Sequence, residues 1–185
     1  NPNRMWGVSF LQKAYHLNAL NAAHCMSILF IGFAVGCPLS GWLSDRMKQR
    51  KPLMGMGTLI AFICLNLVLF YPLSHATLQA ILFIFGLGAS CFFLCFTMIK
   101  EINPVLLAGT VLGFMNSFDS LWEALTEPLV GKIMDMSWDG KMHNGAPIFS
   151  LQDYHTGLFL LSAYFAAALL LWCFLKESYQ FNQSS

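Results

Sequence analysis

Charge is scarce in this 185-residue chain. Only 10% of the residues are charged, whereas a soluble domain carries about 25%. The ten Lys and Arg residues nearly balance the nine Asp and Glu residues, and the resulting net charge of +1 argues against a protein that binds nucleic acid. Apolar residues make up 57% of the chain, which excludes an intrinsically disordered protein. With a mean hydropathy of +0.60, the composition predicts an integral membrane protein that lies in a lipid bilayer.

The sequence also lacks the motifs of metal sites and of common enzymes. It has no Cys-x-x-Cys pair, no histidine pair at metal-ligand spacing, no nucleophile elbow and no phosphate or dinucleotide loop. We therefore expect no metal, no cofactor and no enzymatic activity. The six cysteines all lie in apolar runs, where we interpret them as packing residues: Cys25, Cys37, Cys64, Cys91, Cys95 and Cys173. Because there is neither a signal peptide nor an initiator Met, we expect a piece of a longer protein.

Several apolar runs are long enough to cross a membrane. A helix that spans a bilayer core of about 30 Å needs about 20 apolar residues. Four runs without Asp, Glu, Lys or Arg meet this length, at residues 24–44, 53–72, 76–99 and 156–175. A fifth candidate at residues 105–134 contains three acids, and the run at residues 5–15 is too short for a complete span. We predict an all-α, polytopic membrane helix bundle of about six helices, the first of them incomplete.

Basic residues indicate the side of the membrane on which each link lies. The link at residues 45–52 contains four Lys and Arg residues, and short loops rich in these residues stay in the cytoplasm. Alternation then places residues 100–104 and the tail from Lys176 inside, and the loop at residues 135–155 outside. We therefore expect an integral membrane protein with a cytoplasmic carboxy terminus.

Small residues recur at a spacing of four in two of the predicted helices. Gly32, Gly36 and Ser40 form one smooth face, against which a neighbouring helix can approach closely. Gly109 and Gly113 give the predicted helix at 105–134 a similar face. We interpret both faces as helix-packing surfaces.

The link at residues 45–52 completes a recognisable pattern. Gly41, Asp45, Arg46 and Arg50 match Gly-x-x-x-Asp-Arg-x-Gly-Arg-[Arg/Lys], while Lys and Gln replace the central Gly and Arg. This pattern resembles the cytoplasmic loop between the second and third helices of each half in the major facilitator superfamily of transporters. The replacements weaken a gating role for the two positions that differ.

Three further segments resemble parts of the same family. Residues 6–15 resemble the end of its seventh helix, residues 100–116 its tenth-to-eleventh junction, and residues 128–135 the end of its eleventh helix. The resemblance implies that residues 1–185 form the carboxy-terminal half of a secondary active transporter in a bacterial inner membrane, without its amino-terminal half. It implies transport of a small solute by alternating access. It also implies a cytoplasmic gating loop made of Gly41, Asp45, Arg46 and Arg50.

The predicted helix at 105–134 carries a stripe of acids. Asp119, Glu123 and Glu127 follow one another at steps of four, and Asn116 lies on nearly the same side. A carboxylate at the bilayer centre costs about 2.5–3.5 kcal/mol, so this stripe is expected to face the protein interior or an aqueous cavity. A buried carboxyl group can take up and release protons near neutral pH, which predicts proton coupling or substrate contact. The alternatives are salt bridges to the missing half, a local pair with Lys132, or an outer vestibule without titration.

Three other polar residues are weaker candidates for substrate contact than the acids. By the resemblance, Gln12 and Tyr15 can face a central cavity, although packing explains them as well. Asn116 is a stronger candidate than these two because it shares the acidic face.

Two other functions stay open at this point. A membrane-embedded enzyme would need a nucleophile or a metal cluster near the acids. A scaffold or sensor with the same fold would not transport solute.

Overall fold

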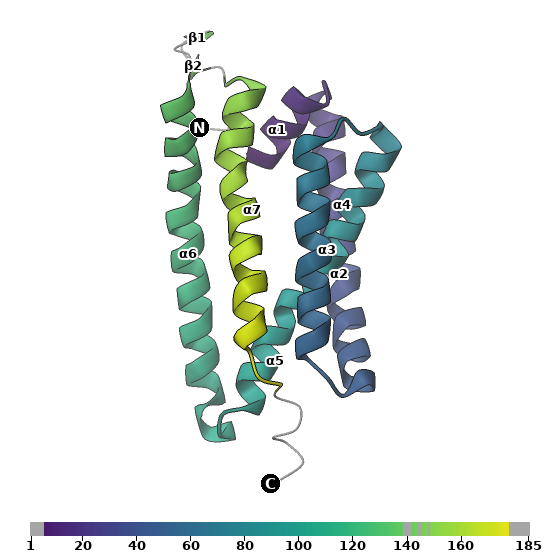
Figure 1. The fold of residues 1–185 in the computed structure, drawn as a ribbon, viewed down its shortest axis with the longest axis vertical. Coiled ribbons are helices and arrows are strands. Elements are labelled where there is room, and N and C mark those ends of the chain that lie inside the picture. The colour runs from purple at the N-terminus through teal and green to yellow at the C-terminus, as the bar shows by residue number, and fades with distance from the viewer. Residues whose placement is uncertain (1–5, 139–141, 144–145, 148, 178–185) are drawn as a thin grey trace.

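The structure is a computed structural model that describes residues 6–138, 142–143, 146–147 and 149–177, and these residues are almost entirely helical (Figure 1). The predicted all-α class is therefore confirmed. The helices, including two 3₁₀ turns (η), are α1 (Trp6–Ala14), α2 (Ala19–Met47), α3 (Lys51–Phe70), α4 (His75–Ala89), η1 (Ser90–Phe93), α5 (Leu94–Glu101), η2 (Val105–Leu107), α6 (Ala108–Ser137) and α7 (Leu151–Phe174). The two-residue strands β1 (Met142–His143) and β2 (Ala146–Pro147) pair antiparallel. The predicted outer loop at 135–155 lies partly outside the described residues.

Five helical segments of the described chain are long and apolar enough to span a membrane: Ala19–Met47, Lys51–Phe70, His75–Glu101, Val105–Ser137 and Leu151–Phe174. Two of them begin earlier than their apolar runs because polar side chains cap them. The side chain of Asn18 accepts a hydrogen bond of 2.7 Å from the backbone N–H of Asn21. Ser150 and Asp153 form a reciprocal capping box at the start of α7. Hydropathy therefore locates each span, and side-chain caps determine where α2 and α7 start.

The apolar run at residues 76–99 is interrupted within its length. It forms α4 as far as Ala89, a 3₁₀ turn at η1, and then α5. The buried hydroxyl of Ser90 donates a hydrogen bond of 2.7 Å to the carbonyl oxygen of Leu87. Such a bond competes with the regular helical ladder, and a tight turn inside a helix bends it.

Glycines allow α2 to approach α4 and η1 closely. A Cβ atom on Gly32 would lie against the carbonyl oxygen of Phe83, and one on Gly86 would lie against that of Leu29. Gly36 faces Ser90 in the same way. The third member of the predicted face, Ser40, is buried and donates to the carbonyl oxygen of a residue in its own helix.

Helix α6 lies at the edge of the bundle, beside α7 (Figure 1). Of its residues, Val130 and Met134 are buried. Apart from the neighbouring residues and backbone of α6 itself, no described heavy atom lies within 4 Å of the position that a Cβ would take on Gly109 or Gly113. The small face predicted for this helix therefore has no packing partner among the described residues.

We expect Gly86→Ala to reduce the free energy of unfolding by about 1–3 kcal/mol, the usual effect of overpacking. The new Cβ would meet backbone atoms of α2, including the nitrogen of Phe33 at 2.7 Å, and backbone has little freedom to move away. Gly41→Ala is the matched control, because it gains the same helix propensity and meets no atom within 4 Å. The measurement is the thermal denaturation of the complete protein in detergent. Equal melting temperatures for the two variants would contradict this account of the contact.

Candidate functional site

A pocket of about 580 Å³ lies between the pair α6 and α7 and the helices α1 to α4. The side facing α1 to α4 is apolar, and the polar lining residues come from α6 and α7. The lining consists of Gly7, Phe10, Met26, Leu29, Leu65, Val68, Leu69, Leu82, Phe85, Asp119, Trp122, Glu123, Thr126, Glu127, Val130, Leu158, Leu161 and Tyr164. A volume of this size suits a small-molecule site, for which about 300–1,000 Å³ is typical.

The three predicted acids of α6 all line this pocket. Asp119, Glu123 and Glu127 meet there because steps of four residues keep them on one side of the helix. Within the described part of the chain, their carboxylates form no ion pair and no side-chain hydrogen bond. Lys132, which the sequence offers as a local partner, is exposed and not paired with them. The structure thus joins the acids in one wall of the pocket, where they are exposed and have no compensating cation among the described residues.

Aromatic side chains stand beside the acids in the same wall. The ring of Trp122 on α6 lies 5.6 Å, centroid to centroid, from the ring of Tyr164 on α7. Thr126 donates a hydrogen bond of 3.5 Å to the Tyr164 hydroxyl oxygen, and Phe118 stacks on Trp122 within α6. The contacts of Trp122 and Thr126 with Tyr164 join α6 to α7 beside the acids.

The other three predicted contact residues are not part of this lining. The hydroxyl of Tyr15 lies 2.8 Å from the carbonyl oxygen of Val68 and 3.1 Å from that of Tyr71, so it serves as a donor to the end of α3. Gln12 is half-buried on α1, and Asn116 is exposed on α6. Their assignment as substrate contacts stays a prediction.

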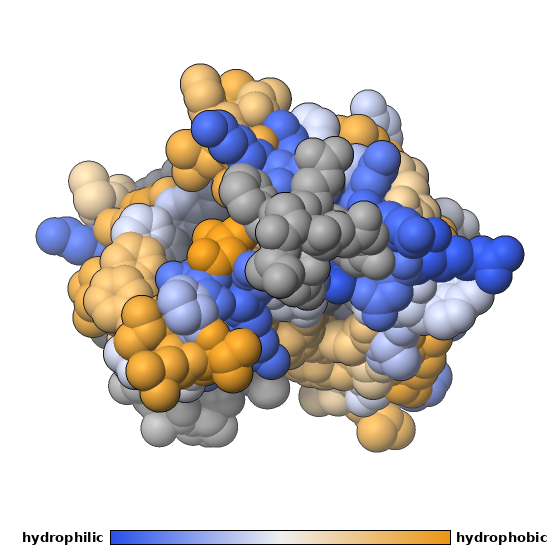
Figure 2. Space-filling model, turned by 90° about the horizontal axis from the view of Figure 1, so that it is seen from below, coloured by the Kyte–Doolittle hydropathy of each residue, from blue (hydrophilic) through white to orange (hydrophobic). Residues whose placement is uncertain are grey.

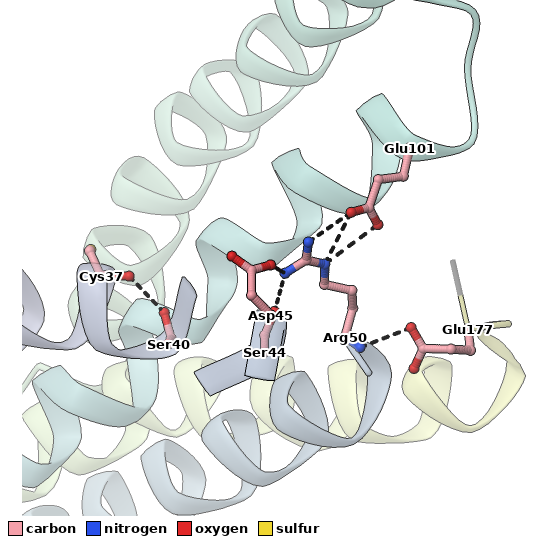
Figure 3. A network of polar contacts seen from close by, with 7 residues as sticks. All are labelled: Cys37, Ser40, Ser44, Asp45, Arg50, Glu101 and Glu177. Atoms are coloured by element: carbon pink, nitrogen blue, oxygen red, sulfur yellow. Dashed lines mark hydrogen bonds and ion pairs between the residues drawn. The ribbon is translucent and has the colours of Figure 1, made fainter. Parts of the chain in front are cut away.

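A cluster of polar contacts surrounds Arg50 at the link between α2 and α3 (Figure 3). The Arg50 side chain is only 8% exposed, and its Nη2 atom lies 2.8 Å from Oε1 of Glu101 at the end of α5. Its Nη1 atom lies 2.6 Å from Oδ1 of Asp45 and also donates to the hydroxyl of Ser44. We call these residues, together with Glu177, the Arg50 cluster.

Glu177, which follows α7, extends the Arg50 cluster to a third segment. Its carboxylate oxygens accept hydrogen bonds from the backbone N–H groups of Arg50, at 2.9 Å, and Lys51, at 3.0 Å. These are orphan donors at the beginning of α3, where a negative charge also complements the helix dipole. Close by, the indole nitrogen of Trp172 donates to the carbonyl oxygen of Lys51 at 2.7 Å. The cluster therefore ties α2, α3, α5 and the end of α7 together.

The charge state of Arg50 follows from this environment. Burial by itself lowers the pKa of the guanidinium. The hydrogen bonds and charges of Glu101 and Asp45 outweigh burial, so the pKa of Arg50 is raised above its ordinary value. Arg50 stays charged at any pH at which the protein is folded.

The sequence pattern identified only part of the Arg50 cluster. It named Asp45 and Arg50, and it also named Arg46, which is exposed with its guanidinium 5.6 Å from the ring centre of Trp42. It did not name Glu101 or Glu177. The predicted membrane topology could have indicated them, because it places both acids on the same side of the membrane as the basic link.

The family model described as Major Facilitator Superfamily matches residues 5–127. The chain belongs to the major facilitator superfamily. It is also 30% identical over 114 residues to the arabinose-proton symporter of Bacillus subtilis (strain 168), which is 62% of this chain and 24% of that protein. The aligned part thus spans about a quarter of the length of this curated relative.

Membership of the major facilitator superfamily points to a membrane transporter rather than to an enzyme. The Arg50 cluster lies at the end of the molecule that Figure 2 shows, where hydrophilic side chains gather. The superfamily match includes Asp45, Arg50 and Glu101 of this cluster and the three acids of α6, while Glu177 lies beyond the matched residues. Two features of the chain are therefore candidates for transport functions, the pocket and the charged end.

We expect Arg50→Ala to destabilise the protein by about 3 kcal/mol, the lower end of the range for breaking a buried pair. The reason is that Glu101, whose side chain is 12% exposed, would keep a charge without its partner. Arg46→Ala is the matched control, and we expect its effect to stay below about 1 kcal/mol because Arg46 is exposed. Thermal denaturation of the complete transporter in detergent measures both. Equal destabilisation by the two variants would show that the buried Arg50–Glu101 pair contributes no more to stability than an exposed arginine does.

Proposed function

We propose that this chain forms the carboxy-terminal half of a secondary active transporter that moves a small solute by alternating access and couples it to protons. The observation that carries the proposal is the pocket of about 580 Å³ whose wall contains Asp119, Glu123 and Glu127. Superfamily membership and the similarity to a proton symporter support it. An amino-terminal half of similar size would complete the cavity.

Proton coupling needs a carboxyl group that is exposed to solvent in turn from each side. Asp119 is the best candidate because, at a rise of about 1.5 Å per residue from Val105, it lies about 21 Å into a bilayer core of about 30 Å. Its side chain is exposed and lines a pocket whose opposite wall is largely apolar. Glu123 and Glu127 lie about 27 Å and about 33 Å along the same helix, at or beyond the outer boundary, and act as additional substrate contacts.

The Arg50 cluster supports movement of the half as one body. All its contacts join segments of this chain, so it makes the end of α2, α3, α5 and α7 rigid. Rocking of two halves around a fixed site requires such rigid units. The exposed faces of Asp45, whose side chain is 67% exposed, and of Arg46 are then free to meet the other half and close the cytoplasmic side. In this proposal the charged end and the carboxy terminus are cytoplasmic, in a bacterial inner membrane.

A scaffold or sensor that does not transport is the second candidate. No observation in the described structure favours it over a transporter. Flux measurements on the complete protein separate the two.

We expect Asp119→Asn to abolish solute-driven proton uptake by the complete transporter in liposomes. Arabinose is the first solute to test because the relative's name gives it. Asp135→Asn is the matched control, since Asp135 is an exposed acid on the same helix but outside the pocket lining. Unchanged coupling in Asp119→Asn would remove this residue from the mechanism, and the absence of flux for every solute tested would favour the scaffold.

A further inference from the structure

The chemistry of the pocket wall narrows the class of solute. We propose that the pocket binds an organic cation with an apolar, aromatic body. This inference rests on the proposed function, because it names the substrate class of the same cavity. The site is defined by the cavity and its two unlike walls, and the acids determine the sign of the charge that it accepts.

The polar wall of the pocket favours positive charge. It contains three carboxyl groups, and the lining includes no Lys, Arg or His. An anion would meet repulsion from each ionised acid, whereas a cation would be attracted by all three. No other described residue forms an ion pair with these acids, so a cationic ligand would not have to displace one.

The opposite wall argues against a strongly hydroxylated solute. Phe10, Met26, Leu65, Leu82 and Phe85 offer no side-chain hydrogen-bonding group to the pocket. A sugar buried against them would leave hydroxyl groups without partners, and this costs binding free energy. A ligand with an apolar body matches this wall.

The aromatic pair adds a cation-binding surface to the polar wall, beside the acids. Trp122 lies on the same turn of α6 as Asp119 and Glu123, and its ring lies 5.6 Å from that of Tyr164. Indole and phenol rings attract cations at their faces, most strongly where water is excluded. A carboxylate beside an aromatic ring therefore binds an ammonium group whose substituents are apolar.

The test uses the complete transporter in detergent and three probes measured by titration calorimetry. Benzyltrimethylammonium is a cation with an aromatic body, phenylmethanesulfonate is an anion with the same body, and arabinose is a neutral sugar. We expect binding of benzyltrimethylammonium at least about tenfold tighter than that of the other two, which corresponds to about 1.4 kcal/mol.

Four variants assign the binding to the pocket. Asp119→Asn and Glu123→Gln each keep the size of the side chain and should weaken cation binding about tenfold. Trp122→Leu should weaken it as well, while Asp135→Asn should leave it unchanged. Thermal denaturation identifies any variant that fails to fold, and the remaining acid variant then carries the test.

The outcomes separate this inference from the proposed function. Tight binding of arabinose, or of the sulfonate, overturns the cation proposal, and proton-coupled flux of that solute would still support the transporter. Cation binding that the two acid variants do not weaken also overturns it. Cation binding that depends on the acids supports it, even where no flux is measured and the proposed function fails.

Discussion

Hydrocarbon cannot solvate a charge or an unpaired backbone group, and the structure depends on this constraint. The backbone meets it by forming helices, in which almost all polar groups are paired within one segment. The chain's few charged side chains meet it in two ways. Arg50 is surrounded by acceptors, with Glu101 2.8 Å away, whereas the acids of α6 line a pocket. The first solution makes one end of the protein rigid, and the second leaves charges available to a ligand.

The contrast between these two solutions extends to packing. At the Arg50 cluster, residues separated by 51 and by 127 positions in sequence are joined by hydrogen bonds. Helix α6, in comparison, has few buried residues, and they lie in its final third at Val130 and Met134. Segments with few buried contacts open or shift at low free-energy cost. Within this chain, the acids lie on the helix that is held least tightly, opposite the helices that glycine contacts hold most closely.

The sequence was sufficient to predict the fold class and the acidic wall. Long apolar runs in lipid form membrane-spanning helices. Steps of four residues put Asp119, Glu123 and Glu127 on one face of their helix, whichever helices pack against it. It could not predict where helices end or that α4 breaks at Ser90, since single side-chain hydrogen bonds decide these points. The capping box at Ser150 is an exception that a motif could have found.

Long-range partners were harder to predict from one sequence. Glu101 and Glu177 are single acids in unrelated segments, and only the packing of α5 and the end of α7 brings them to Arg50. The apolar wall of the pocket could not be predicted from the sequence either, because Phe10, Leu65 and Leu82 are equally consistent with ordinary helix packing. Their contribution to a site depends on the distance between α6 and the rest of the bundle, which local sequence does not encode.

Proton coupling and cation binding would use the same carboxyl groups of the pocket wall. Asp119 and Glu123 are exposed acids in that wall, and they have no ion-pair partner among the described residues. Two occupants can neutralise such a carboxylate, a proton on its oxygen or a cation beside it. Each occupant makes the other less favourable at the same acid, because a neutral carboxyl group no longer attracts the cation. In the proposed transporter, the two acids would therefore connect proton coupling to the affinity of the pocket for positive charge.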